Sequence, residues 1–342
     1  MSEMNGSWRL AHRPVGEITP EVFSWHEEPL PPLQDGEVRI RVIYLSLDPA
    51  MRGWLADRKS YVPPVQIGEV MRGAVTAQVV ESRSDRFQPG DYVGANTGWQ
   101  QYANVPARVL TPLPAGIPLT AHLAVLSHIG LTAYFGLLDI GQPQPGETLV
   151  ISAAAGAVGS LVGQIGKLKG CRVIGIAGSD AKCGWLTGEL GFDGAINYKT
   201  ENVYKALRQH CPDGIDIYFE NVGGEILDAV LAQVNVGARI PLCGLISQYN
   251  ATEPVPGPYN FASLLVNRVR LQGFIVHDYW DRGPEAFPEL ATWLAAGQLQ
   301  YRVDVVEGLE NAPEAINRLF DGRKQGKLLV QVAAETMGAP AG

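Results

Sequence analysis

Small residues at a fixed spacing after an apolar run suggest a site that could hold a dinucleotide. The run at 149–151 is followed by a glycine-rich turn and then by apolar residues at helical spacing. At Gly156 the backbone would lie against a pyrophosphate, and at Gly159 a helix would pack closely on a strand. The N–H groups at the helix N-terminus would face the phosphates. The predicted cofactor-binding residues of this turn are Ala154, Gly156, Ala157, Val158 and Gly159.

The second apolar strand, predicted at 172–176, runs out into Ala177-Gly178-Ser179 without an acid. Enzymes that use NAD usually place an Asp or Glu at this strand end, on the ribose hydroxyls. Here Ser179 supplies a donor and Lys182 a positive charge, which suit a 2′-phosphate. The pattern therefore favours NADP(H). Asp180 lies beyond the strand end, and we interpret it as the N-cap of the next helix.

The composition is that of a globular protein with two domains. The chain has 342 residues, a formal net charge of −8 and dispersed basic residues, so neither a nucleic acid nor an anionic membrane is an expected partner. No apolar run is long enough to span a membrane, and residues 1–13 are polar without a signal-peptide core. These features predict a cytoplasmic protein.

The metal-ligating residue types show no ligand spacing. The four cysteines and six histidines are scattered, with no Cys-x-x-Cys pair and no His-x-x-x-His on a helix. Free thiols agree with a reducing compartment. The sequence predicts no metal site.

The sequence around the glycine-rich turn predicts two kinds of structure, a β domain before the turn and alternating strands and helices after it. Short β-rich runs with Gly and Pro punctuation between about 38 and 114 predict a small, mostly antiparallel β domain. A helix is then expected over 120–138. Alternating strand and helix signals after the glycine-rich turn predict a doubly wound parallel sheet. These signals are helices at 201–210, 225–234 and 285–296, and strands at 194–198, 215–223, 238–244 and 271–276.

The C-terminal part returns to a strand from 303, a helix at 312–320 and a last strand at 327–332. We expect this part to rejoin the β domain. The predicted domains are therefore residues 1–126 with 303–342, and residues 127–302.

Seven motifs in this order carry a resemblance to a known family: AAAGAVG, AGSDAK, NYK, YFENVGG, CGLISQYN, LQGFIV and GKLLV. Over nearly the whole chain the sequence resembles the zinc-independent medium-chain dehydrogenase/reductases, and within them the prostaglandin reductase, alkenal double-bond reductase and curcumin reductase branch. The resemblance implies a GroES-like, mostly antiparallel β domain plus a Rossmann domain. Where zinc-dependent members carry metal ligands, this chain has Ser46-Leu47-Asp48-Pro49 and Gly68-Glu69-Val70.

The resemblance also implies a reaction. In this branch NADPH delivers a hydride to the β-carbon of an α,β-unsaturated ketone or aldehyde, and a hydrogen bond stabilises the enolate that forms. The motif match assigns that hydrogen bond to Tyr249, which would also contact the cofactor and the substrate. Further cofactor contacts implied by the matches are Ser179, Lys182, Tyr198, Asn221 and Gly244, with Gly223 a weaker candidate.

Two positions, Ala50 and Lys324, depart from the pattern of the branch, and His277 lies near a third position of interest. Ala50, before Met51, stands where many members have a tyrosine that lines the substrate pocket, which predicts room for a bulkier substrate. Lys324 replaces an asparagine near the cofactor and could meet a phosphate. His277 lies near a substrate-side tyrosine of some members; it could face the substrate or be an ordinary loop histidine.

Two alternatives remain open from the sequence: NADPH-dependent quinone reduction, and NADPH binding without catalysis. Members of the family are commonly dimers through an edge strand of the Rossmann sheet. The segment 268–276 is a plausible edge strand for a homodimer.

Overall fold

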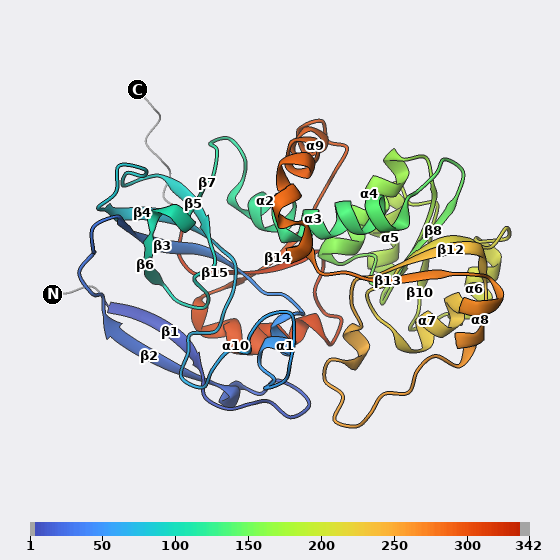
Figure 1. Cartoon of the computed structure of the whole chain (residues 1–342), viewed down its shortest axis with the longest axis horizontal. Helices are drawn as coiled ribbons and strands as arrows, with labels where there is room; N and C mark the ends of the chain where they lie inside the picture. Colours follow the sequence, from blue (N-terminus) through green and yellow to red (C-terminus); the bar gives the residue numbers. More distant parts are fainter. Residues whose placement is uncertain (1–3, 336–342) are drawn as a thin grey trace. The chain divides into compact units, whose positions relative to one another are not determined.

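Strands that alternate with helices build one part of the computed structural model, which describes residues 4–335 (Figure 1). The chain divides into unit 1, within residues 1–123 and 303–342, and unit 2, residues 124–302. We describe each unit by itself.

Unit 2 contains a parallel sheet with the strand order β10-β9-β8-β11-β12-β13. The order reverses between β8 and β11, the topological switch point at which doubly wound folds bind ligands. Its strands are β8 (Thr148–Ile151), β9 (Arg172–Ala177), β10 (Gly194–Asn197), β11 (Ile215–Phe219), β12 (Val234–Leu242) and β13 (Arg270–Gly273).

Helices cover both faces of this sheet, which explains why its strands read as continuous apolar runs. On one face Leu149 and Val173 pack beneath α4 (Ala157–Leu168), at Gly166. On the other face Val150 and Ile174 join a core cluster that includes residues of α6 and α7. The remaining helices of this unit are α3 (His128–Phe135), α5 (Asp180–Gly188), α6 (Val203–His210), α7 (Gly224–Leu231), α8 (Ala262–Val266) and α9 (Gly283–Ala295).

Unit 1 contains a sheet with the order β14-β15-β3-β4-β5-β7, in which β6 also pairs with β3. Among the described strands of this sheet the pairs are antiparallel except for β14 with β15, which are parallel. The strands are β3 (Glu37–Ser46), β4 (Val75–Ser82), β5 (Tyr92–Ala95), β6 (Tyr102–Pro106), β7 (Thr111–Pro112), β14 (Val303–Glu307) and β15 (Lys327–Gln331).

β1 (Met4–Leu10) and β2 (Phe23–Pro29) form a separate two-stranded antiparallel sheet, which the sequence analysis did not predict. Unit 1 also contains the short helices α1 (Met51–Trp54) and α10 (Ala312–Ala315). The helix predicted over 312–320 therefore ends early, and a 3-10 turn, Ile316–Leu319, continues it.

The prediction of one helix over 120–138 is wrong. The structure has α2 (Leu119–Ala124), then a break, then α3, and finally a π-helical turn over Gly136–Gly141. Ser127 causes the break, because it is extended (φ −148°) and its hydroxyl caps α3 by accepting from the N–H of Ile129. A Cβ on Gly130 would lie 1.9 Å from the carbonyl oxygen of Val125, in the turn before α3, so only glycine fits at this position.

Two boundaries in unit 2 also differ from the prediction. α7 ends at Leu231, and Val234, predicted as its last residue, begins β12. The predicted strand 271–276 ends at Gly273, and a 3-10 helix, Val276–Arg282, begins where the strand was expected to continue.

Candidate functional site

The glycine-rich turn lies between β8 and α4, at the carboxyl end of the parallel sheet. A Cβ on Gly159 would lie 2.5 Å from the carbonyl oxygen of Ala153 and 2.8 Å from Cα of Ala154, so only glycine permits this approach of helix and turn. Ala154 is fully buried, and its N–H donates to the carbonyl of Ile176 at 3.0 Å. An alanine therefore fits the first small position of the fingerprint because it faces β9, away from solvent.

The first turn of α4 offers N–H groups for an anion. Gly156 is the N-cap, in an extended conformation (φ −82°, ψ 174°), and it has no side chain with which to cap the helix. The N–H groups at the start of a helix have no partner within the helix. With Ala157 and Val158 as its first residues, α4 therefore has the donors and the dipole that fit a diphosphate.

The carboxyl end of β9 brings together the residues predicted for the 2′-phosphate. The hydroxyl of Ser179 accepts from the N–H of Lys182 at 3.3 Å. The N–H of Tyr198 donates to the carbonyl of Ala177 at 3.1 Å. A Cβ on Gly178 would lie 3.1 Å from the Tyr198 hydroxyl, so this hydroxyl lies beside the turn that carries Ser179.

The interpretation of Asp180 as the N-cap of α5 is wrong. Ser179 is the N-cap, since it is extended (φ −166°) and its side chain makes the capping bond, whereas Asp180 is the first helical residue. The side chain of Asp180 instead accepts a hydrogen bond from Asn197 at 2.7 Å.

Glu220, for which the sequence analysis assigned no role, connects the loops at the switch point. Its carboxylate is fully buried, and Oε1 accepts from the hydroxyls of Ser152 (2.8 Å) and Tyr218 (3.0 Å) and from the N–H of Val222 (2.6 Å). Burial raises the pKa of Glu220, while the hydrogen bonds that it accepts act to lower it. An acid directly after an apolar strand, in YFENVGG, was the signal that could have identified it.

Asn221 extends this network to the glycine-rich turn. Its main-chain N–H donates to Ser152 Oγ, and its side-chain Nδ2 donates to the Ser152 carbonyl, both at 2.8 Å. Gly223 has φ +79°, a conformation that favours glycine, and it is the N-cap of α7. The predicted contact Asn221 is thus held against Ser152, directly after β8.

Tyr249 lies after the loop that leaves β12. Its hydroxyl accepts from the N–H of Leu245 at 3.3 Å and lies 3.0 Å from the position that a Cβ on Gly244 would occupy. The N–H of Gly244 donates to the carbonyl of Glu220 at 3.1 Å. The network therefore brings Asn221, Gly244 and Tyr249 to the same end of the sheet.

The other predicted site residues lie elsewhere in the two units. His277 is exposed and lies in the 3-10 helix that follows β13. Ala50, Met51 and Lys324 belong to unit 1. Met51 is fully buried in the core cluster of that unit, Ala50 is half-buried at the start of α1, and Lys324 donates to the carbonyl of Gly326 at 3.2 Å.

A buried ion pair includes Asp48, in the Ser46-Leu47-Asp48-Pro49 segment. Nζ of Lys327 lies 2.5 Å from Oδ1 of Asp48, and the hydroxyl of Ser46 donates to the other carboxylate oxygen. Burial lowers the pKa of Lys327, whereas Asp48 raises it. Within residues 4–335, His, Cys, Asp and Glu side chains do not gather in groups of three that could hold a metal ion.

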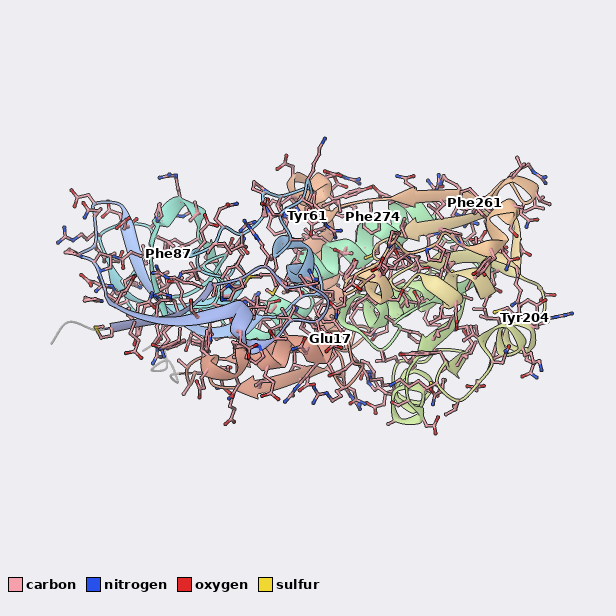
Figure 2. All side chains as sticks on the ribbon, turned by 90° about the horizontal axis from the view of Figure 1, so that it is seen from below. Glu17, Tyr61, Phe87, Tyr204, Phe261 and Phe274 are labelled. Atoms are coloured by element: carbon pink, nitrogen blue, oxygen red, sulfur yellow. The ribbon has the colours of Figure 1, made fainter. Side chains whose placement is uncertain are left out.

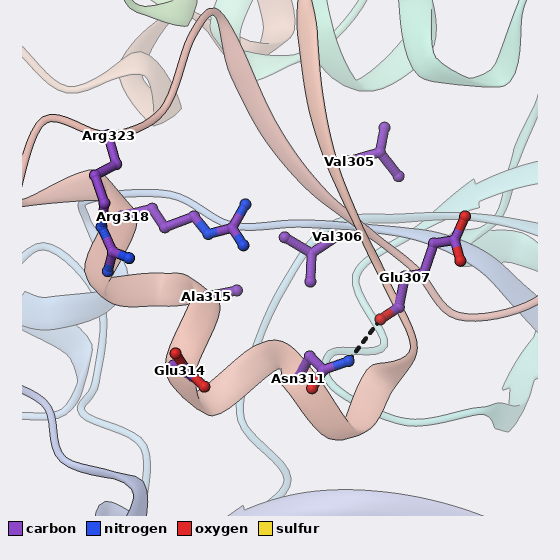
Figure 3. Close-up of a pocket in the computed structure, with 8 residues that line it drawn as sticks. All are labelled: Val305, Val306, Glu307, Asn311, Glu314, Ala315, Arg318 and Arg323. Atoms are coloured by element: carbon purple, nitrogen blue, oxygen red, sulfur yellow. Dashed lines mark hydrogen bonds between the residues drawn. The ribbon is translucent and has the colours of Figure 1, made fainter.

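Figure 3 shows a surface pocket of about 300 Å³ in unit 1, beside β14 and α10. Arg318 and Arg323 line it, and each is paired with a carboxylate, of Asp304 and Asp321 respectively. None of the predicted site residues lines this pocket, so it gives no support to a role in the chemistry.

A doubly wound sheet with a phosphate-binding turn at its switch point defines a dinucleotide-dependent protein. Residues 6–113 match the family described as the N-terminal domain of oxidoreductase, and residues 157–296 match the family described as zinc-binding dehydrogenase. The chain belongs to the zinc-independent branch of the medium-chain dehydrogenase/reductases and is an NADP-dependent oxidoreductase.

Relatives cover almost the whole chain. The NADPH-dependent curcumin reductase of Escherichia coli is 47% identical over 97% of this chain and 98% of its own length. Prostaglandin reductase 1 of Bos taurus is 42% identical over 95% and 98%. The crystal structure of CurA from Vibrio vulnificus in complex with NADPH has a TM-score of 0.92 and 48% identity over 96% of this chain and 100% of that chain.

The resemblance, the fold class and NADP(H) as cofactor are thus confirmed. In the part of the chain that the structure describes, no helix is long and apolar enough to cross a membrane.

Proposed function

We propose that the protein reduces the carbon–carbon double bond of α,β-unsaturated ketones or aldehydes with NADPH. The observation that carries the proposal is the 47% identity to a curcumin reductase over almost the full length of both chains. Ser179 and Lys182, which follow the end of β9, support the choice of NADPH. They offer a hydroxyl donor and a positive charge to a 2′-phosphate.

Reduction of the double bond needs a hydride at the β-carbon, stabilisation of the enolate that forms, and a proton from water at the α-carbon, which gives the saturated product. Bound NADPH would supply a hydride for the β-carbon of the substrate. Negative charge then develops on the carbonyl oxygen, and the hydroxyl of Tyr249 would stabilise it by donating a hydrogen bond. The hydroxyl oxygen accepts from Leu245, so its proton is directed to another group. A conjugated carbonyl accepts the electrons without a metal ion, so this role needs no Lewis acid.

The reaction is tested by following NADPH oxidation with trans-2-hexenal, a phenyl butenone and a naphthoquinone, and by analysing the products. Enone reduction predicts a product with a saturated carbon–carbon bond. Turnover with the naphthoquinone alone would support quinone reduction instead, and no turnover with any acceptor would support a binding protein without catalysis.

The role of Tyr249 is tested by Tyr249→Phe. Loss of one donor to a developing oxyanion lowers kcat by roughly 100-fold or more. Tyr204→Phe, on an exposed tyrosine of α6 (Figure 2), is the matched control and should leave kcat unchanged. Equal rates for the two variants would remove Tyr249 from the mechanism.

The 2′-phosphate site is tested by titrating NADPH and NADH into Lys182→Ala. Loss of one charged contact should weaken NADPH by about 1.5 to 3 kcal/mol and leave NADH nearly unchanged. Lys205→Ala, in α6, is the control and should leave both affinities as they are. Equal weakening of NADPH and NADH by Lys182→Ala would refute the assignment.

We further propose that Ala50 sets the size of the substrate, that Met51 and His277 also contact the substrate, and that Lys324 contacts the cofactor. Ala50→Tyr should shift the substrate profile toward smaller enones, as judged by kcat/KM over a series from trans-2-hexenal to a diaryl enone. An unchanged profile would contradict this role.

A homodimer is the oligomeric state that we propose. In the described sheet order β13 lies at one end, and all four of its residues are exposed. Nearby in the chain Phe261 (62% exposed; Figure 2), Leu265 (82%) and Val266 (66%) expose apolar side chains. A second copy could extend the sheet across a twofold axis and cover these side chains.

Light scattering coupled to size exclusion tests this state. The wild type should have twice the mass of one chain, and Leu265→Glu should shift the mass toward a single chain. A monomeric wild type would overturn the proposal.

A further inference from the structure

Asp180 places a carboxylate beside the strand end that we assign to the 2′-phosphate. It follows Ser179 directly, is exposed, and begins α5 two residues before Lys182. A carboxylate at this strand end ordinarily accepts from ribose hydroxyls and repels a 2′-phosphate. The structure must therefore direct this charge away from the phosphate.

Asn197 is the residue that directs it. Asn197 is the last residue of β10 and pairs in register with Ala177, the last residue of β9. Its side-chain Nδ2 donates to Oδ1 of Asp180 at 2.7 Å. Asn197 is 5% exposed, so the carboxylate is held against a nearly buried donor at the end of the neighbouring strand.

The amide of Asn197 can face Asp180 only with its nitrogen. Its Oδ1 accepts from the N–H of Lys199 at 3.2 Å. A carboxylate accepts hydrogen bonds and cannot donate them, so the amide oxygen has no favourable contact with Asp180.

The backbone of Asn197 is fixed as well. Its N–H donates to Oε1 of Glu201 at 2.7 Å, and its carbonyl accepts from the N–H of Glu201 at 2.8 Å. The side chain therefore presents one donor, in one direction, to the carboxylate.

We propose that Asn197 determines the preference for NADPH over NADH by holding the carboxylate of Asp180 on the β10 side of the strand end. Asn197 is a positioning residue, because it acts through Asp180. The inference rests on the proposed phosphate site of Ser179, Lys182 and Tyr198. When the bond is absent, the Asp180 carboxylate is free to turn toward the ribose, where it repels a 2′-phosphate and accepts from a 2′-hydroxyl.

The test is fluorescence titration of NADPH and NADH into the wild type, Asn197→Ala, Asp180→Asn and the double variant. In Asn197→Ala the ratio Kd(NADH)/Kd(NADPH) should fall on the order of tenfold. Asp180→Asn should keep or raise the ratio, because it removes the negative charge. The double variant should recover the ratio of Asp180→Asn, because no carboxylate is left to misplace.

A merely structural role gives a different result. Loss of local packing would weaken both coenzymes alike and would leave the ratio unchanged, and Asp180→Asn would not rescue it. Asn202→Ala is the control, since Asn202 caps α6 by accepting from the N–H of Lys205 and has no bond to Asp180. An unchanged ratio in Asn197→Ala, or a double variant as impaired as the single one, would overturn the inference.

Lys182→Ala separates this inference from the site on which it rests. If Lys182→Ala weakens NADPH alone while Asn197→Ala leaves the ratio unchanged, the phosphate site stands and the role of Asn197 is refuted. If Lys182→Ala affects both coenzymes equally, the phosphate site is misplaced and the inference falls with it.

Discussion

The two units bury charge in different ways. In unit 1 the carboxylate of Asp48 is neutralised by the ammonium group of Lys327, and both side chains are almost inaccessible. In unit 2 the carboxyl group of Glu220 is equally buried, but its described hydrogen bonds come from neutral donors, of Ser152, Tyr218 and Val222.

The difference follows from the sheets. The carboxyl ends of parallel strands bring several loops to one edge, and the N–H groups of those loops meet there. In the mostly antiparallel sheet of unit 1 the strand ends alternate between opposite edges, so fewer loop N–H groups gather at any one edge. A buried carboxylate near a strand end, such as Asp48, is stabilised there by a side chain of opposite charge. The edge that can hold Glu220 by neutral donors is therefore also the edge that can hold an anionic cofactor.

The largest effect is expected from Lys327→Met in unit 1. Removing one partner of a buried ion pair deprives the Asp48 carboxylate of the ammonium group of Lys327 and costs roughly 3 to 5 kcal/mol. Denaturant unfolding should show this loss, and Asp48→Asn with Lys327→Met should recover much of it. Arg83→Met, in the exposed pair with Asp35, is the control and should change nothing measurable. If Lys327→Met is as stable as the wild type, the stability of unit 1 does not depend on the ion pair between Lys327 and Asp48.

A smaller effect is expected from Gly159→Ala in unit 2. The added Cβ meets the backbone of Ala153 and Ala154, next to the Ser152 that donates to Glu220. Such overpacking costs about 1 to 3 kcal/mol, and it should also weaken NADPH binding, as measured by titration.

Gly184→Ala is the matched control for this change. It also lies within a helix, but a Cβ there has no neighbour within 4 Å, so the variant should gain about 0.5 to 1 kcal/mol. If Gly159→Ala and Gly184→Ala change the free energy of unfolding equally, the glycine-rich turn is not closely packed against α4.

The smallest effect is expected from Glu220→Gln, and it depends on pH. Because the pKa of Glu220 is raised in the folded state, its contribution to stability is complete below the unfolded pKa and is lost as pH rises through the folded pKa. A glutamine keeps an acceptor for the same donors but does not titrate. The variant should therefore gain stability relative to the wild type as pH rises from 4 to 8, measured by denaturant unfolding. A stability difference between variant and wild type that does not vary with pH would show that burial does not raise the pKa of Glu220 in the folded state.

Local patterns predicted most elements of unit 2 because both faces of its strands are buried. The strand 172–176 and the helix 201–210 were found to within a few residues. The break at Ser127 was missed, since the segment is apolar on either side and the break depends on the contact between Gly130 and Val125. The strand β1 was missed because its pairing with β2 joins residues about twenty positions apart.

The same limit applied to the site. The sequence predicted Ser179, Lys182 and Tyr198 from motif positions, but it gave Asp180 the wrong local role. Capping by Ser179 or Asp180 looks equally plausible in a linear pattern, because both side chains can accept from N–H groups. Ser179 caps α5 because the side chain of Asp180 is bonded to Asn197. The register of β10 against β9 places Asn197 beside Asp180.

The sequence by itself determined the dinucleotide turn, the strand end without an acid, the cofactor and the family, because each depends on residues that are close along the chain. Only the tertiary structure decided that Glu220 joins three strand ends, that Lys327 neutralises Asp48, and that Asn197 holds Asp180. The physical reason is that sheet register and packing decide which distant residues form a hydrogen bond or an ion pair. Neither register nor packing can be read from the residue types alone.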